Sequence, residues 1–138
     1  MSAKRILIVD DDKIAVDAFT RLLNDAGYDI LSAADGSDAV SIARHEKPDL
    51  IILDLVFPPD VSHGGGVPWD GFLIIGWLRR MEEARDIPVI IVTGSEDATN
   101  KQRALEAGAV DFFQKPVDAE QLVSSVRRAL HQDAAGAA

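Results

Sequence analysis

The chain has 138 residues, 47% of them hydrophobic and 27% charged, which is the size and composition of one soluble globular domain. It contains no cysteine, so disulfide bonds and zinc–thiolate sites are excluded, and its 14 basic and 23 acidic residues give a net charge of −9, which argues against nucleic-acid binding. The sequence has no signal-peptide pattern and no apolar run near the ~20 residues of a membrane span, so we expect a cytoplasmic protein without membrane contact.

The first part of the chain predicts two strands and two helices. Residues 6–9 are apolar and rich in β-branched side chains, a pattern typical of a parallel strand that is buried on both faces. Apolar residues at helical spacing then run from 14 to 26, and Asp12 is the expected cap of this helix. A weaker strand at 29–33 and a helix around residues 39–43 follow.

Strands and helices continue to alternate up to residue 130. The further predicted strands are 50–53, 89–92 and 110–114, and the further predicted helices are 72–83, 98–107 and 118–130. This alternation predicts an α/β fold, a doubly wound five-stranded parallel sheet with five helices and right-handed crossovers. We expect the domain to span residues 1–131 and to be followed by a disordered tail at 132–138.

One long connection, residues 56–69, interrupts the alternation. Its sequence VFPPDVSHGGGVPW contains paired prolines and three consecutive glycines, and it has no helical or strand period. Loops of this length are uncommon in compact domains and are usually functional or mobile. We expect it to shield a site at the end of the third strand, to hinder a partner or to form a partner surface, unless it is a neutral insertion.

The helix predicted at 72–83 carries apolar residues on more than one face. Leu73 and Trp77 form a second apolar row beside the row that suits the sheet. We expect this second row to pack under the long connection, together with Trp69. Exposure of the two side chains would instead favour an interface with a partner protein.

Charged and hydroxyl side chains mark the ends of four of the predicted strands. The residues are Asp10 and Asp11 after the first strand, Asp54 after the third, Thr93 at the fourth and Lys115 after the fifth. Because doubly wound sheets bind ligands at the carboxyl ends of their strands, we expect these side chains to meet. Clustered carboxylates repel one another, so the group needs a cation or a raised pKa. Their hard oxygen atoms favour Mg²⁺ or Ca²⁺ over zinc, and a small carboxylate site that also meets phosphate suits Mg²⁺. The hydroxyl and the amine would then hold the oxygens of a phosphoryl group, and a carboxylate would be its nucleophile.

In this order the motifs resemble a bacterial response-regulator receiver domain, from about residue 4 to residue 130. The resemblance implies the flavodoxin-like strand order 2-1-3-4-5. In the segment ILIVDDD, it implies that Asp10 and Asp11 bind Mg²⁺, together with Asp54 and the backbone carbonyl of Val56. In the segment IILDL, it implies that Asp54 is the phosphoacceptor.

The resemblance also assigns the residues that bind the phosphoryl group. In the segment IIVTG, Thr93 matches the switch hydroxyl and Gly94 the small neighbour that leaves room for the phosphoryl group. In the segment FFQKP, Lys115 matches the lysine of the site, whose bond to Pro116 is typically cis in this family.

A conformational switch is implied by the same resemblance. Phe112 falls at the aromatic switch position, but Phe113 beside it is also apolar, so a plain core residue is an almost equal interpretation. Phosphorylation would draw Thr93 inward, Phe112 would follow, and the binding face near helix 98–107 would change. That helix has few apolar residues, which suits an element that moves between two states.

The implied function is that of a phosphoacceptor signalling module in a two-component system or phosphorelay. A histidine kinase or a histidine phosphotransfer protein would donate the phosphoryl group, and the chain would catalyse only its own phosphorylation and dephosphorylation. Dephosphorylation is expected to be slow, because Val56 has no polar side chain to orient water.

No output domain follows residue 130, so we expect a downstream protein target. A phosphorylation-dependent homodimer and a fragment of a longer regulator or hybrid kinase both stay open.

Two other classes of protein share parts of the pattern. A phosphatase of the haloacid dehalogenase type also forms an aspartyl phosphate, and Asp10 and Asp12 fit its first motif. Ile14 occupies the position where that motif has threonine or valine, and the chain is too short for a cap domain. A flavin-binding module needs a phosphate loop rich in serine, threonine and glycine where this chain has three acids. The receiver interpretation therefore fits best.

Overall fold

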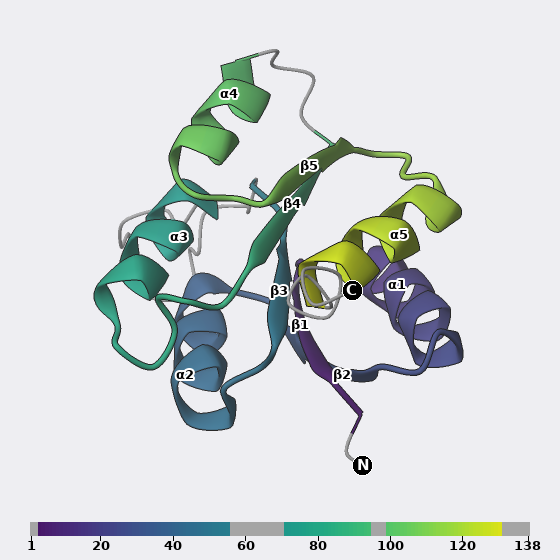
Figure 1. Cartoon of the computed structure of the whole chain (residues 1–138), viewed down its shortest axis with the longest axis horizontal. Coiled ribbons are helices and arrows are strands. Elements are labelled where there is room, and N and C mark those ends of the chain that lie inside the picture. The colour runs from purple at the N-terminus through teal and green to yellow at the C-terminus, as the bar shows by residue number, and fades with distance from the viewer. Residues whose placement is uncertain (1–2, 56–70, 95–98, 131–138) are drawn as a thin grey trace, which may run out of the picture.

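Strands and helices alternate from Arg5 to Leu130 in the computed structural model, which describes residues 3–55, 71–94 and 99–130 (Figure 1). The strands are β1 (Arg5–Val9), β2 (Asp29–Ala33), β3 (Leu50–Leu53), β4 (Val89–Thr93) and β5 (Asp111–Gln114). The helices are α1 (Lys13–Asp25), α2 (Gly36–Glu46), α3 (Gly71–Arg80), α4 (Thr99–Glu106) and α5 (Ala119–Leu130). Within the described ranges, no helix is both long enough and apolar enough to cross a membrane. The connection 56–69 and the expected tail at 132–138 lie outside the described residues.

The strands form one parallel sheet in the order β2-β1-β3-β4-β5, which confirms the predicted fold. In its centre, Ile8 of β1 lies opposite Ile52 of β3, and Ile52 lies opposite Ile90 of β4. The strand order changes direction between β1 and β3, because β2 lies on one side of β1 and all later strands lie on the other. The carboxyl ends of β1 and β3 are therefore where a ligand site is expected in such a sheet.

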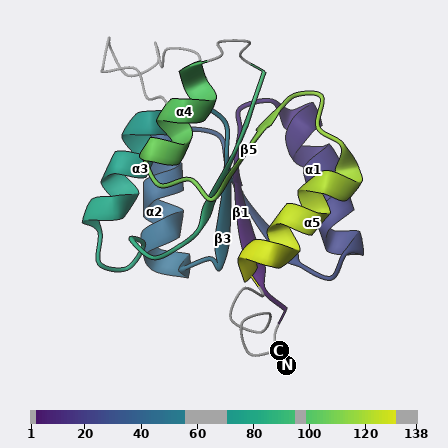
Figure 2. The same ribbon diagram turned by 45° about the horizontal axis from the view of Figure 1, so that its top comes forward.

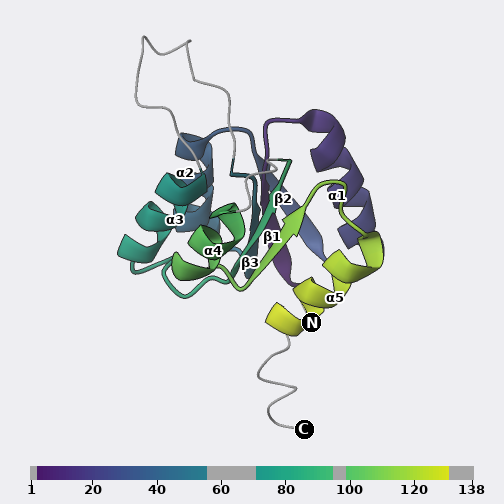
Figure 3. The same ribbon diagram turned by 90° about the horizontal axis from the view of Figure 1, so that it is seen from above.

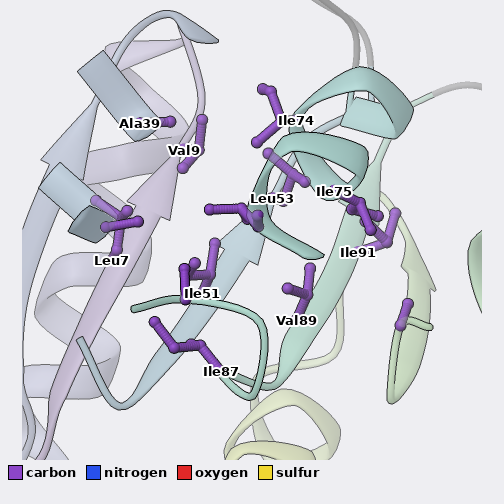
Figure 4. Packing of buried hydrophobic residues seen from close by; sticks show 14 of the residues in the cluster. Leu7, Val9, Ala39, Ile51, Leu53, Ile74, Ile75, Ile87, Val89 and Ile91 are labelled. Atoms are coloured by element: carbon purple, nitrogen blue, oxygen red, sulfur yellow. The ribbon is translucent and has the colours of Figure 1, made fainter. Parts of the chain in front are cut away.

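Helices cover both faces of the sheet, with α2, α3 and α4 on one side and α1 and α5 on the other (Figures 2 and 3). Side chains alternate between the two faces along each strand, and in the inner strands β1, β3 and β4 the apolar residues of both faces are buried. On the side of α2 and α3, the buried strand residues pack against Ile74 and Ile75 of α3 and Ala39 of α2 (Figure 4). The strand residues of this cluster shown there include Leu7, Val9, Ile51, Leu53, Val89 and Ile91.

Aspartate side chains cap three of the helices. Asp12 accepts a hydrogen bond from the backbone N–H of Ile14 at 3.0 Å, as predicted for the first helix. At α2 the cap is Asp35, which accepts from the N–H of Asp38 at 2.8 Å. Before α5, Asp118 accepts from the N–H of Gln121 at 3.0 Å. These bonds satisfy N–H groups that have no partner inside the helix.

Helix α3 differs from the prediction at its end and on its outer face. It ends at Arg80 and not at 83, because the chain turns after it and buries Ala84 completely. The side chains of Leu73 and Trp77 are 41% and 48% exposed, so the expectation that this row is covered was wrong. Trp69, the expected partner of this row, lies outside the described residues.

Candidate functional site

Four strand ends bring the predicted site residues to one edge of the sheet. Asp10 and Asp54 directly follow β1 and β3, Thr93 is the last residue of β4, and Lys115 directly follows β5. Backbone hydrogen bonds continue the sheet beyond the strands. The N–H of Asp54 donates to the carbonyl of Val9 at 3.0 Å, and the N–H of Lys115 donates to the carbonyl of Thr93 at 2.8 Å. Hydrogen bonds of the sheet therefore fix the backbone positions of Asp54 and Lys115.

Three carboxylates form the centre of this site. One oxygen of Asp10, one of Asp11 and one of Asp54 all lie within 4.8 Å of one another. Asp10 and Asp54 are only 4% and 7% exposed, whereas Asp11 is exposed. Carboxylates this close together repel one another, and burial reduces the screening of that repulsion by water. A nearby positive charge is therefore needed to offset the repulsion between the three carboxylates.

Lys115 supplies one positive charge. Its Nζ donates a hydrogen bond to Oδ2 of Asp10 at 2.8 Å and another to Oδ2 of Asp54 at 3.4 Å. Burial by itself lowers the pKa of Lys115, but the hydrogen bond to Asp10 and the charges of Asp54 and Asp10 together outweigh it, so the pKa is raised above 10.5. The contribution of the Lys115 charge to stability is therefore present at neutral pH and is lost in base, as the pH rises through the raised pKa. The bond from Lys115 to Pro116 is cis, as the sequence resemblance implied.

Asp10 is held in place through both of its carboxylate oxygens. Oδ1 accepts a hydrogen bond from the backbone N–H of Asp12 at 2.9 Å, while Oδ2 accepts the one from Lys115. Asp12 thus positions Asp10 with its backbone and caps α1 with its side chain. Its carboxylate does not belong to the metal-binding group of Asp10, Asp11 and Asp54.

The donor set fits a small, hard divalent cation. All three side chains offer carboxylate oxygens, the ligands that Mg²⁺ prefers, and the described residues that form the group include no sulfur or imidazole ligand. Three carboxylates face one ammonium group, so a divalent cation would offset the remaining repulsion. The backbone carbonyl of Val56, expected from the resemblance to be a further ligand, lies outside the described residues.

The substitution Asp11→Asn should have opposite effects with and without metal. In EDTA, it should raise the free energy of unfolding by up to about 1 kcal/mol, because it removes one exposed charge from the repelling group. In titrations it should weaken Mg²⁺ binding about tenfold, because a site with fewer charged ligands binds the cation less tightly. Urea unfolding and Mg²⁺ titration measure the two effects. Asp17→Asn is the control, because it removes an exposed carboxylate of α1 outside the group. It should change the free energy of unfolding and the Mg²⁺ affinity less than Asp11→Asn does.

Of the predicted switch residues, Thr93 ends β4 at the same edge of the sheet as this group, and Phe112 lies in β5 opposite Ile91. Thr93 is fully buried, and a Cβ built on Gly94 would meet nothing within 4 Å, so the space beside that residue is open. Phe112 is half-buried against the core on the side of α2, α3 and α4, whereas Phe113 packs against the core on the side of α1 and α5. Phe112 is therefore the one of the two rings that lies on the same face of the sheet as α4.

Gly71 is a positioning residue that the sequence did not identify. Its N–H donates to the carbonyl of Leu55 at 3.0 Å, so the start of α3 contacts the residue that follows Asp54. A Cβ at Gly71 would lie 2.8 Å from Cα of Leu55 and 2.9 Å from the carbonyl oxygen of Asp54. Only glycine allows so close an approach. The Asp70–Gly71 pair was visible in the sequence, but nothing local to it indicated this contact.

The family model described as the response regulator receiver domain matches residues 6–127 of the chain. The DNA-binding dual master transcriptional regulator RpaA of Synechocystis sp. is 38% identical over 128 residues, which are 93% of this chain and 49% of that protein. Protein PilH of Pseudomonas aeruginosa is 38% identical over 126 residues, which are 91% of this chain and 97% of that protein. The chain thus spans about half the length of RpaA and nearly all of PilH.

A solved structure is similar over almost the whole chain. It is the receiver domain of a sensor histidine kinase from Pseudomonas aeruginosa PAO1, with a TM-score of 0.79 and 26% sequence identity. The similarity covers 94% of this chain and 98% of that one, and that structure has a magnesium ion coordinated in its active site cleft. The region from 6 to 127 that the family model matches includes every site position described above.

Proposed function

The chain belongs to the response regulator receiver domain family, and on that premise we propose that Asp54 accepts a phosphoryl group from a phosphohistidine. The chain is a receiver domain of two-component signalling. The observation that carries it is the position of the Asp54 carboxylate. It is nearly buried at the switch point of the sheet, in one group with Asp10 and Asp11, and Nζ of Lys115 lies 3.4 Å from it.

The proposed reaction moves the phosphoryl group from nitrogen to oxygen. A carboxylate oxygen of Asp54 forms a bond to phosphorus while the bond from phosphorus to the donor imidazole breaks. The electron pair of that bond leaves with the imidazole nitrogen, which then takes up a proton from water. A carboxylate needs no base for this attack, because it carries no proton at neutral pH. The product is an aspartyl phosphate.

The surrounding residues stabilise the charge of the transferring group. Lys115 is a cation at neutral pH and reaches Asp54, so its ammonium group is placed to bind an oxygen of the phosphoryl group. Asp10, Asp11 and Asp54 would hold Mg²⁺, which the magnesium ion in the related Pseudomonas receiver domain supports. When bound, Mg²⁺ supplies positive charge that offsets the negative charge on the phosphoryl oxygens.

The response to phosphorylation is assigned to Thr93 and Phe112. Thr93 ends the strand next to β5, and the hydroxyl would turn towards an oxygen of the phosphoryl group. Phe112 lies on the face that carries α4, so a change at Thr93 would leave room for this ring to move inward. The surface formed by α4 and β5 would then bind a different protein. Slow dephosphorylation stays a prediction, since Val56 lies outside the described residues.

The proposed partners follow from this chemistry. The donor is a histidine kinase or a histidine phosphotransfer protein, and the target is a protein and not a nucleic acid, since the chain has a net charge of −9. The chain would act in the cytoplasm and catalyse only its own phosphorylation and dephosphorylation. The match covers 49% of the length of RpaA and 97% of the length of PilH, so relatives of this chain include both a longer regulator and a protein of about its own size. The role proposed for Asp54 is the same in a stand-alone receiver and in the receiver part of a longer regulator.

Intact-mass measurement after incubation with acetyl phosphate tests the proposal. The wild-type protein should gain the mass of one phosphoryl group when Mg²⁺ is present and none in EDTA. Asp54→Asn should gain none under either condition, while its circular dichroism spectrum stays that of the wild type. Asp12→Asn is the matched control, because its side chain only caps α1, and it should still be phosphorylated. Phosphorylation of Asp54→Asn at the wild-type rate would contradict the proposal.

A further inference from the structure

Helix α3 turns two large apolar side chains away from the domain. The helix lies between α2 and α4 (Figures 1 and 3), and its inner side packs against the core on the sheet. The exposed residues of the helix, which we call the outer face of α3, are Leu73, Gly76, Trp77 and Arg80. Leu73 and Trp77 are one helical turn apart, so their exposed surfaces adjoin. Adjoining apolar side chains, unlike single ones, mark an interaction surface.

The spacing of the outer face suits contact with another helix. Where two helices pack, a side chain of one inserts into a hole between four residues of the other, which lie at positions i, i+3, i+4 and i+7. Leu73, Gly76, Trp77 and Arg80 have this spacing. A Cβ on Gly76 would meet nothing within 4 Å, so the hole is open above that residue. The leucine and the tryptophan give it apolar walls, and an apolar side chain of a second helix would fit between them.

Arg80 gives the outer face a positive charge. The charged residues of α3 are Arg79 and Arg80, and the helix contains no acidic residue. The guanidinium of Arg79 donates to three backbone carbonyls, those of Arg85 at 2.6 Å, Ile87 at 3.1 Å and Gly108 at 3.1 Å. Arg80 is exposed, and no described residue forms an ion pair with it. A partner at the outer face therefore meets the charge of Arg80.

The neighbouring helices leave this positive charge largely uncompensated. Towards α4, the guanidinium carbon of Arg103 lies 4.1 Å from the centre of the Phe72 ring, so a second cation borders α3. Towards α2, Glu83 pairs with Arg44 at 3.6 Å, which offsets its charge. Glu82 is exposed but follows the end of the helix. The outer face is thus locally basic on a chain whose net charge is −9.

We propose that the outer face of α3 docks an amphipathic helix of a partner protein, which places an apolar side chain over Gly76 and an acidic side chain beside Arg80. Tryptophan and arginine are the residue types that most often carry the binding energy of an interface. A second copy of this chain suits the face less well, because two chains of charge −9 repel each other and α3 has no acid to offer Arg80. Docking here needs no phosphoryl group on Asp54 and uses a surface other than α4 and β5.

A designed peptide tests this docking. The probe is a fluorescein-labelled peptide of about 20 residues, long enough to form a helix in water, with a stripe of leucines and a glutamate one turn from each leucine. Anisotropy is measured in EDTA without a phosphodonor, so the result is independent of the chemistry at Asp54. The peptide should bind with a Kd on the order of 100 μM, as expected of a small interface. A peptide with serine in place of the leucines should not bind. General attraction between opposite charges cannot explain binding, since peptide and protein are both acidic.

Three variants locate the bound peptide. Gly76→Gln fills the hole and should weaken binding about tenfold, while the helix keeps its stability because glutamine is the better helix former. Arg80→Glu should weaken binding about fivefold or more. Its matched control, Arg21→Glu, makes the same change of charge on α1 at the other face of the sheet and should have little effect. Trp77→Ala should weaken binding about tenfold or more, whereas Ile14→Ala, which removes an exposed apolar side chain of α1, should not. No binding to wild type, or wild-type affinity in Gly76→Gln and Arg80→Glu, would overturn the proposal.

Two further measurements distinguish the partner helix from other occupants. In Trp69→Phe, Trp77 is the only tryptophan, and acrylamide should quench its fluorescence in the free protein and less so with the peptide bound. Sedimentation should show a monomer. A dimer that Gly76→Gln dissociates would assign the face to a second copy. Protection of Trp77 in a monomer, lost when residues 56–69 are deleted, would assign the face to that segment of the chain itself. Either of these two results would overturn the proposal.

Discussion

Lys115→Met is expected to slow phosphorylation of Asp54 by acetyl phosphate by a factor of about 10²–10³, which is the usual cost of removing one preorganised group that stabilises charge in a transition state. The ammonium group of Lys115 lies 2.8 Å from Asp10 and 3.4 Å from Asp54, so it is already in place before the phosphoryl group arrives. Methionine keeps a similar volume and removes the charge. The rate is measured by intact mass at several times after mixing, with Mg²⁺ at saturation.

Two controls separate the loss of the charge from other causes. Lys115→Arg keeps a cation at this position and should lose less of the rate than Lys115→Met. Lys115→Met itself should bind Mg²⁺ at least as tightly as wild type, because it removes a positive charge next to two of the proposed ligands. A slow reaction then reflects weaker stabilisation of the phosphoryl group and not a loss of metal. Phosphorylation of Lys115→Met at the wild-type rate would refute the role given to this residue.

Gly71→Ala is expected to lower the free energy of unfolding by about 1–3 kcal/mol, the cost that overpacking usually has in a well-packed interior. The added Cβ would lie 2.8 Å from Cα of Leu55 and 2.9 Å from the carbonyl oxygen of Asp54. Both are backbone atoms, so no side chain can simply rotate away. The backbone next to Asp54 has to shift, and the rate of phosphorylation by acetyl phosphate should fall as well.

Gly76→Ala is the matched control, because it makes the same change in the same helix. A Cβ at Gly76 meets nothing within 4 Å, and alanine is the better helix former, so this variant should gain about 0.5–1 kcal/mol of stability. Urea unfolding measures both variants, and the two changes should have opposite signs. Equal stability of the two variants would mean that the close approach of Gly71 to Leu55 does not exist in solution.

Much of the fold could be predicted from local patterns. The apolar runs 6–9, 50–53 and 89–92 became buried central strands, since a short apolar run rich in β-branched residues is typical of a strand that is covered on both faces. The strand order came from the family resemblance and agrees with the sheet. The exposed second row of α3 was predicted wrongly, because helical spacing says which residues share a face and not whether something covers that face.

The composition of the site could also be predicted from the positions of its residues in the chain. Residues at the carboxyl ends of parallel strands must lie at one edge, so Asp10, Asp54 and Lys115 could be placed together on that ground alone. The sequence could not show that Lys115 is closer to Asp10 than to Asp54, or that Asp12 holds Asp10 through its backbone. These details depend on the side-chain conformations that packing selects.

The amino-acid sequence was enough to specify the strands, the helices and the acidic strand ends, because each of these follows from the type and spacing of residues near one another in the chain. The contacts of α3 with its neighbours, in contrast, were set by the packing of the folded domain. Gly71 against Leu55, Arg103 over Phe72 and Arg79 on the carbonyl of Gly108 each join different elements of the fold. Such contacts arise when helices and strands pack together, and no periodicity or propensity within one segment records which residue of another segment will lie opposite.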